Sequence, residues 1–179
     1  MKPTDEIAIP AGTNAGLSGC TNSLMLSALG KPRSVFTAEC AAITNKNLAK
    51  RIKTDNVGPF RVTGFDLAVD DLKAIFAAIK AQRPAEYAML GTAGMLCCRL
   101  VRGSKTSISN HSWGTAIDLT IEGKLDVRGN GRAQAALIAI APIFNKHGWF
   151  WGATFRIEDA MHFEVSAQRI NKWKAEGKL

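Results

Sequence analysis

The stretch SNHSWGTAIDLTI, residues Ser109–Ile121, decides the fold class of this chain. From Ala116 onward, apolar and polar side chains alternate, which is the period of a β-strand with one buried face. The residues on that face are Ile117, Leu119 and Ile121. Asp118 falls on the opposite face, and Gly114 predicts a turn that returns His111 toward the same side. The stretch therefore predicts a strand whose ionisable groups point away from the core.

A second stretch, EDAMHFEV at residues Glu158–Val165, repeats this arrangement further along the chain. Its apolar face consists of Met161, Phe163 and Val165. The same alternation places His162 and Glu164 on the opposite face. If the two strands are neighbours with their polar faces aligned, His111, Asp118 and His162 converge on one point.

On either side of these two stretches, the remaining chain shows blocks of helical and extended patterns. Apolar residues recur at three- and four-residue intervals after Asp70 or Asp71 until Arg83-Pro84, which predicts a helix. Similar patterns predict helices at Thr37–Lys53, Arg132–His147 and Ala167–Glu176. Short apolar runs bounded by Gly or Ser predict strands at Tyr87–Leu90, Cys97–Val101, Thr115–Ile121, Trp149–Ile157 and Met161–Val165.

This order of elements predicts the α+β class, because strict βαβ alternation is absent. We expect a single domain with a central, largely antiparallel sheet flanked by helices, and with the polar site on the sheet. Residues 1–33 are rich in Gly, Thr, Asn and Ser, so we expect an irregular, partly docked N-terminal arm. Residues 34–179 then form the domain that carries the site.

The composition excludes several classes of protein. A chain of 179 residues, 46% of them apolar, is long enough for one domain with its own core. No apolar stretch reaches the roughly 18 residues of a membrane span, and Met1–Pro10 lacks the apolar centre of a secretory signal. We therefore expect a protein made in the cytoplasm. The net charge of +8 favours polyanionic partners, but the basic residues are scattered, which disfavours nucleic acid.

The four cysteines show no metal-binding or redox spacing. Cys20, Cys40, Cys97 and Cys98 include no C-x-x-C pair. Adjacent residues of a strand point to opposite faces, so Cys97 and Cys98 suit neither a shared metal nor an ordinary disulfide with each other. The sequence predicts free, buried or half-buried thiols in a reducing compartment.

The polar faces of the two predicted strands suggest a metal site. Two imidazoles and one carboxylate, from His111, Asp118 and His162, are a plausible set of ligands for a catalytic zinc, which keeps its fourth position for water. Each residue taken singly is equally compatible with a hydrogen-bonded structural role. Asp159 comes just before the second strand and could act as a general base or as a turn residue, and Glu158 competes for that role.

Other candidate residues surround this set. Glu164 could orient an imidazole through a hydrogen bond. Arg99 and Arg102 precede the first histidine and could clamp a substrate carboxylate, although a solvated position fits each of them as well. The segment Asp126–Gly131 resembles the start of a calcium loop, but its twelfth position is occupied by Leu137, so it predicts only a turn.

The motifs S-x-H-x-x-G-x-A-x-D (Ser109–Asp118) and D-x-x-H-F-E (Asp159–Glu164) resemble the paired signatures of the D-alanyl-D-alanine carboxypeptidase family of zinc peptidases. This family, which also includes L-alanyl-D-glutamate endopeptidases and several phage endolysins, falls in the lysostaphin, D-Ala-D-Ala carboxypeptidase and hedgehog fold group. The resemblance extends over about residues 57–165 and is not clear in the first thirty or so.

The resemblance implies roles for individual residues. One zinc ion would be bound by His111, Asp118 and His162, with Asp159 as the general base. An arginine upstream of the first histidine would contact the substrate or the developing oxyanion; we assign Arg99, with Arg102 as its competitor. Independently of the resemblance, we expect Ser109 and Glu164 to support the ligands.

The resulting hypothesis is a zinc metallopeptidase that hydrolyses peptide bonds in peptidoglycan stem peptides through zinc-activated water. The motifs do not separate a D-Ala-D-Ala carboxypeptidase from an endolysin-type endopeptidase. The alternative is a hedgehog-like zinc-containing binding module without hydrolytic activity. A basic nucleic-acid-binding domain has only the net charge in its favour. We expect a monomer that reaches the cell wall only after export or release.

Overall fold

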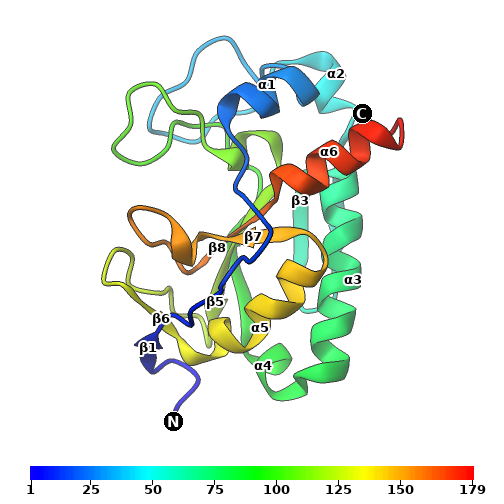
Figure 1. The fold of residues 1–179 in the computed structure, drawn as a ribbon. Coiled ribbons are helices and arrows are strands. Elements are labelled where there is room, and N and C mark those ends of the chain that lie inside the picture. The colour runs from blue at the N-terminus through cyan, green and yellow to red at the C-terminus, as the bar shows by residue number, and fades with distance from the viewer.

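A four-stranded sheet forms the centre of the computed structural model, which describes residues 1–179. Its strands lie in the order β4 (Leu90–Gly94), β5 (Ala116–Ile121), β8 (His162–Val165) and β7 (Trp149–Trp151). Each neighbouring pair is antiparallel. Figure 1 shows helices on one side of this sheet and long loops on the other. The predicted α+β fold with a largely antiparallel sheet is confirmed.

The two central strands have the alternation that the sequence predicts. Ile117 of β5 lies directly opposite Phe163 of β8, and both side chains are fully buried. The next pair in the register joins Asp118 to His162. Because side chains alternate between the faces of a sheet, this pair points away from the core.

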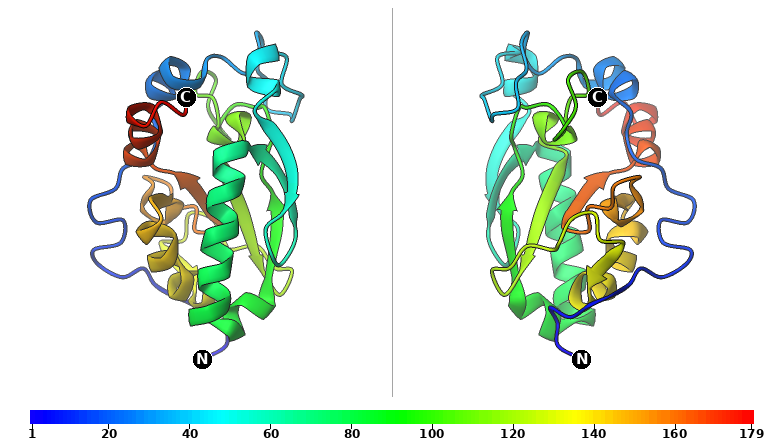
Figure 2. Two further views of the ribbon diagram at one scale, coloured as in Figure 1. Left: turned by 90° about the vertical axis from the view of Figure 1, so that its right-hand side faces the viewer. Right: turned by 90° about the vertical axis from the view of Figure 1, so that its left-hand side faces the viewer.

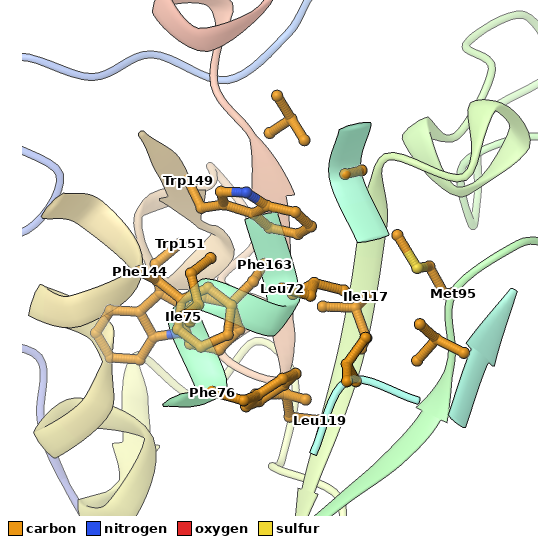
Figure 3. Packing of buried hydrophobic residues seen from close by; sticks show 14 of the residues in the cluster. Leu72, Ile75, Phe76, Met95, Ile117, Leu119, Phe144, Trp149, Trp151 and Phe163 are labelled. Carbon is orange, nitrogen blue, oxygen red and sulfur yellow. The ribbon is translucent and has the colours of Figure 1, made fainter. Parts of the chain in front are cut away.

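Helices cover the apolar face of the sheet. The longest, α3 (Asp66–Gln82), places Leu72, Ile75 and Phe76 against the sheet, as Figure 3 shows. Helix α5 (Ala135–Lys146) contributes Phe144, which stacks on Phe163 with ring centroids 4.1 Å apart. Figure 2 shows α3 running the length of the molecule beside the sheet. The remaining helices are α1 (Asn22–Leu29), α2 (Lys46–Ala49), α4 (Pro84–Met89) and α6 (Ala167–Ala175).

Two antiparallel strand pairs lie outside the main sheet. The N-terminal β1 (Glu6–Ala8) pairs with β6 (Arg132–Gln134), and β2 (Ile52–Asn56) pairs with β3 (Arg61–Phe65). Two short 3-10 helices, η1 (Asn110–Trp113) and η2 (Gly152–Thr154), precede β5 and β8. No helix combines the length and the apolar character that a membrane crossing requires.

The predictions for residues 1–56 differ most from the structure. The helix expected at Thr37–Lys53 is wrong: only α2 is helical, because the Asn45 side chain accepts hydrogen bonds from the first backbone amides of α2 and starts the helix there. The strand β2 follows from Ile52, and the sequence analysis missed the β2–β3 pair. Residues 1–33 contain β1 and α1 and are therefore not irregular throughout.

Four further boundaries need correction. The strand expected at Tyr87–Leu90 is instead α4, which begins at Pro84, followed by β4. The segment Cys97–Val101 forms isolated bridges and no strand. The segment Trp149–Ile157 is extended only as far as Trp151. The helix expected from Arg132 begins at Ala135, because residues 132–134 pair with β1. For residues 132–134 a contact with a distant segment overrides the local pattern.

The prediction of four free thiols is also wrong. Cys40 and Cys97 form a disulfide, with Cα atoms 5.0 Å apart, while Cys20 and Cys98 remain free. The strand geometry of Cys97 and Cys98 excludes a disulfide only between these two neighbours. The partner of Cys97 instead comes from the loop before α2, which the bridge between Ala41 and Cys98 holds alongside.

Candidate metal centre

A cavity of about 610 Å³ opens on the polar face of the main sheet. Residues 99–109 bound it on one side, and residues 125–128 and 155–161 contribute to the other. These loops project to the left of the sheet in Figure 1 and face the viewer in the right-hand view of Figure 2. Residues 19–22 of the N-terminal segment also line the cavity.

The strand pair β5–β8 places two of the predicted ligands side by side. Asp118 and His162 are direct cross-strand partners, so their side chains share one face of the sheet. Asp118 Oδ1 lies 3.1 Å from His162 Nδ1. The imidazole is buried, with 7% of the residue exposed, and the aspartate is half-buried.

The third predicted ligand, His111, comes from η1. The buried indole of Trp113 donates a hydrogen bond to the Gly30 carbonyl and anchors this short helix. Gly114 ends it with a left-handed backbone (φ 67°) and leads directly into β5. The turn predicted at Gly114 therefore brings His111 Nε2 to 3.2 Å from both Asp118 Oδ1 and His162 Nδ1.

Hydrogen bonds on the far side of each ring fix the tautomers. His111 Nδ1 lies 2.7 Å from the Met95 carbonyl oxygen, which can only accept, so Nδ1 carries the proton. His162 Nε2 lies 2.9 Å from the Glu164 carboxylate and donates to it. When neutral, the two imidazoles in these tautomers would direct a lone pair at the Asp118 oxygen and at each other, an arrangement that suits a cation between them.

The three donor atoms fit a metal ion. Their separations of 3.1 to 3.2 Å form a nearly equilateral triangle. Around a tetrahedral zinc with ligand distances near 2.0–2.1 Å, neighbouring donors lie about 3.3 Å apart. Two neutral imidazoles with one carboxylate also leave a fourth position open, as in catalytic rather than structural zinc sites.

The pKa values of Asp118 and His162 reflect their close contacts within the triad. Burial alone would raise the pKa of Asp118, but hydrogen bonds from His111 and His162 outweigh it and hold that pKa below its usual range. Burial alone would lower the pKa of His162, whereas its bonds to Asp118 and Glu164 raise it to about 10. For both residues the close contacts within the triad, and not burial, decide the direction of the pKa shift.

Asp159 lies on the cavity wall near this triad. Its Oδ2 accepts a hydrogen bond from Arg128 Nε at 3.2 Å, while Oδ1 is buried and has no hydrogen-bond partner. Burial is the main reason that the pKa of this carboxyl lies above its usual value. Buried acceptors without a donor are uncommon in folded proteins, and a catalytic role is one reason for a protein to retain one.

Glu158 was the alternative candidate for the general base, but its carboxylate is fully used in hydrogen bonds to the backbone. Its Oε2 accepts hydrogen bonds from the consecutive backbone amides of Gly129, Asn130 and Gly131, at 2.9 to 3.2 Å. Its Oε1 accepts from the amide of Ala160 at 2.8 Å. Glu158 therefore holds the turn at residues 126–131 in place, and its oxygens are not free to act as a base.

Glu164 orients His162, as the sequence suggested for this face of β8. Only 3% of Glu164 is exposed, and its Oε2 accepts from both His162 Nε2 and Asn110 Nδ2, the latter at 2.9 Å. Its Oε1 accepts from the Cys20 backbone amide at 3.0 Å. Three donors satisfy this buried carboxylate and define the direction of the imidazole.

The predicted arginines and Ser109 also reach the cavity. Arg99, Arg102 and Ser109 all line it. The buried Ser112 hydroxyl positions the backbone of Arg99 by accepting its amide hydrogen bond at 3.1 Å. Arg99 Nη1 donates to the Leu100 carbonyl at 3.2 Å, and Arg102 is exposed at the rim. No hydrogen bond joins either guanidinium to the triad.

Sequence reasoning missed four contributors to this site. They are the Met95 carbonyl, Cys20, Asn110 and Arg128. Arg128 had been placed in a simple turn, yet it pairs with Asp159 across 31 positions of sequence. No periodicity marks such residues, because each acts through a contact with a distant segment. The one available signal was Asn110, which lies inside the first motif beside His111.

Comparisons with known proteins agree with this geometry. A search of curated proteins and a search of solved structures found no match. A family model described as D-alanyl-D-alanine carboxypeptidase matches residues 102–165, a segment that contains both motifs and all three triad residues. The match and the buried triad together indicate a peptidase with a potential metal site. The resemblance carried by the two motifs is thereby confirmed: residues 102–165 of this chain match the D-alanyl-D-alanine carboxypeptidase family.

Proposed function

We propose that this protein is a zinc-dependent peptidase that hydrolyses peptide bonds in peptidoglycan stem peptides. The observation that carries the proposal is the triangle of His111 Nε2, Asp118 Oδ1 and His162 Nδ1, whose edges match those of a tetrahedral zinc site. The family match at residues 102–165 supports the choice of peptide substrates.

A zinc ion held by these three residues would supply a Lewis acid that polarises the scissile carbonyl and lowers the pKa of water. The other steps fall to the chain's own residues. Asp159 Oδ1 has no partner and would accept the proton of the attacking water and return it to the leaving amine. Arg128 would keep Asp159 in position through Oδ2, so that Oδ1 remains available.

The charges around the cavity favour an acidic peptide. Four arginines line it: Arg99, Arg102, Arg128 and Arg156. Asp118 and Glu164 are occupied by the histidines, so the accessible side chains of the rim are mostly positive. Arg99 would hold a substrate carboxylate or stabilise the developing oxyanion. The net charge of +8 would draw the protein to an anionic cell wall after export or release.

The test is digestion of purified muropeptides, followed by mass spectrometry. The zinc-loaded protein should release stem-peptide fragments, and a chelator should abolish the activity. Asp159→Asn should bind zinc as the parent does and lose activity by about two to four orders of magnitude, the usual contribution of a general base.

Asp70→Asn is the control, because Asp70 is an exposed carboxylate on α3 outside the cavity. It should cleave at the parental rate. Bound zinc with no cleavage of any stem peptide by the parent would contradict the proposal and favour a zinc-containing binding module.

A further inference from the structure

We propose that residues 14–22, the N-terminal strap, are a positioning element of the metal centre and set its affinity for the ion. The inference rests on the proposed metal site but concerns a segment outside residues 102–165, the part of the chain that the family model matches. In Figure 1 the blue chain crosses the strands β7 and β8 on its way to α1.

One end of the strap is anchored by Asn14. The residue is 5% exposed, and its backbone is in the left-handed region (φ 60°). Its amide donates to the Trp151 carbonyl and to Thr154 Oγ1, both at 2.8 Å. Its carbonyl oxygen accepts from the Trp151 amide and from Asn145 Nδ2, also at 2.8 Å. The four bonds fix the strap to the edge strand β7 beside η2.

The middle of the strap runs along the end of β8. The Ser18 carbonyl accepts from the amide of Ala167 at 2.9 Å, and the Cys20 thiol donates to the Val165 carbonyl at 3.1 Å. Gly19 lies so close that a Cβ there would be 3.0 Å from Glu164 Oε1. The strap backbone is therefore in contact with the carboxylate that orients His162.

The contact with Glu164 completes a relay of hydrogen bonds to the metal site. The Cys20 amide donates to Glu164 Oε1 at 3.0 Å, and Asn110 Nδ2 joins the Cys20 carbonyl (3.2 Å) to Glu164 Oε2 (2.9 Å). Glu164 then accepts from His162 Nε2. Without the strap, Oε1 of a buried carboxylate has no donor, and the carboxylate no longer has a defined orientation.

The other end of the strap holds the segment that carries His111. Asn22 Nδ2 donates to the Ile108 carbonyl at 2.7 Å, and Asn22 Oδ1 accepts from the Ile108 amide at 2.6 Å. Ile108 and Ser109 lead directly into η1. The strap thus braces both imidazoles, one through Glu164 and the other through the approach to His111.

The experiment uses the full chain and two strap variants. Gly19→Ala pushes a methyl group against Glu164 Oε1, and Asn22→Ala removes both bonds to Ile108. Zinc affinity is measured by competition with a chromophoric chelator, and the ligand geometry by the visible absorption of the cobalt-substituted protein. Both variants should bind zinc about 10- to 100-fold more weakly, the usual effect of losing a group that orients a ligand. The cobalt bands should also change.

Thr13→Ala is the control, because the Thr13 hydroxyl bonds only to the nearby Pro10 carbonyl, before the strap begins. It should keep the parental zinc affinity and cobalt spectrum. Urea unfolding of the metal-free proteins checks that the variants fold, and Gly19→Ala tests the inference even if Asn22→Ala is unstable.

The outcomes separate this inference from the proposed function. A folded Gly19→Ala variant with parental zinc affinity and an unchanged cobalt spectrum would overturn the role of the strap, whether or not the parent cleaves peptides. Weaker binding in the variants supports it even if the parent proves to be a binder and not a peptidase. A parent that takes up no metal overturns both.

Discussion

Gly114 illustrates how one residue decides whether the triad can form. Its left-handed backbone turns the chain from η1 into β5, and its carbonyl accepts the amide of Phe65 at 2.9 Å. A Cβ at this position would lie 2.7 Å from the Phe65 nitrogen and 2.8 Å from the Gly64 Cα. Both are backbone atoms, so the neighbours cannot move aside cheaply.

We therefore expect Gly114→Ala to lower the free energy of unfolding by about 3 kcal/mol or more, from backbone strain together with overpacking. Urea denaturation measures this loss. Gly103→Ala is the matched control, since Gly103 is also left-handed (φ 81°) but a Cβ there meets no atom within 4 Å. It should cost only the strain of about 1–2 kcal/mol. Equal losses in the two variants would contradict the steric argument.

Asp126 should make the stability of the protein depend on pH. The residue is buried, and its Oδ1 has no partner, although Oδ2 accepts the Gln134 amide at 2.7 Å. Burial raises the pKa of Asp126 to about 6, from an ordinary value of 3.8. A raised carboxyl pKa destabilises the folded state where the group is ionised, so the penalty is full above pH 6 and disappears below about pH 4.

Asp126→Asn should accordingly be more stable than the parent at pH 7.5, by about 2–3 kcal/mol for a shift of this size. The difference should shrink as the pH falls from 6 to 4, as followed by urea denaturation at each pH. Asp55→Asn should show the opposite sign, because a hydrogen bond with Lys73 lowers the pKa of Asp55 and stabilises its ionised form. If the difference in unfolding free energy between Asp126→Asn and the parent did not change with pH, the raised pKa of Asp126 would be refuted.

The segment before α2, which contains Cys40, is held in place by a disulfide. It has little regular structure of its own, and the disulfide between Cys40 and Cys97 ties it to the chain that leads to Arg99. The amide of Cys97 also donates to the His111 carbonyl at 3.0 Å. The bond closes a loop across a sequence separation of 57 residues, so it restricts the unfolded chain considerably.

Replacing both cysteines by serine should lower the free energy of unfolding by about 4 kcal/mol, which the chain-entropy model gives for a loop of this length. The measurement is urea denaturation with and without dithiothreitol. The reductant should destabilise the parent and leave the double variant unchanged. Cys20→Ser serves as the control, because Cys20 is a free thiol and its variant should remain sensitive to the reductant. A parent indifferent to dithiothreitol would count against the bond.

For the folded chain as a unit, the metal site couples ligand binding to stability. The triad joins η1, β5 and β8, and its three donor atoms lie 3.1 to 3.2 Å from one another. A metal ion that binds the folded chain and not the unfolded one stabilises it, by about 2.7 kcal/mol at a free concentration of 100 Kd. For a chain of this size that corresponds to a rise in Tm of roughly 5–10 °C.

We expect zinc to raise the Tm by this amount in differential scanning fluorimetry, and a chelator to reverse it. His162→Ala should abolish the shift. His147→Ala should retain it, since His147 ends α5 with Nδ1 2.9 Å from the Ile143 carbonyl and lies outside the cavity. A shift that survives in His162→Ala would place the metal elsewhere.

Local periodicity was enough to predict several parts of this protein. Alternation in Ser109–Ile121 and Glu158–Val165 was enough to predict β5, β8 and the shared polar face of Asp118 and His162, because a strand has only two faces. The apolar stripe after Asp70 predicted most of α3, because residues three and four positions apart share one face of a helix. His111 could be added because the turn at Gly114 is only a few residues from the strand.

The disulfide and the hydrogen bonds around Glu164 could not be predicted in this way, because their partners are far apart along the chain. The Cys20 amide and Glu164 are 144 positions apart, and Cys40 and Cys97 are 57 apart. No local pattern encodes such pairings. The disulfide also ties Cys40, which lies in the segment Thr37–Lys53 where a helix is predicted, to a distant part of the chain. Hydrogen bonds to a buried carboxylate form only once folding has excluded water and brought both segments together.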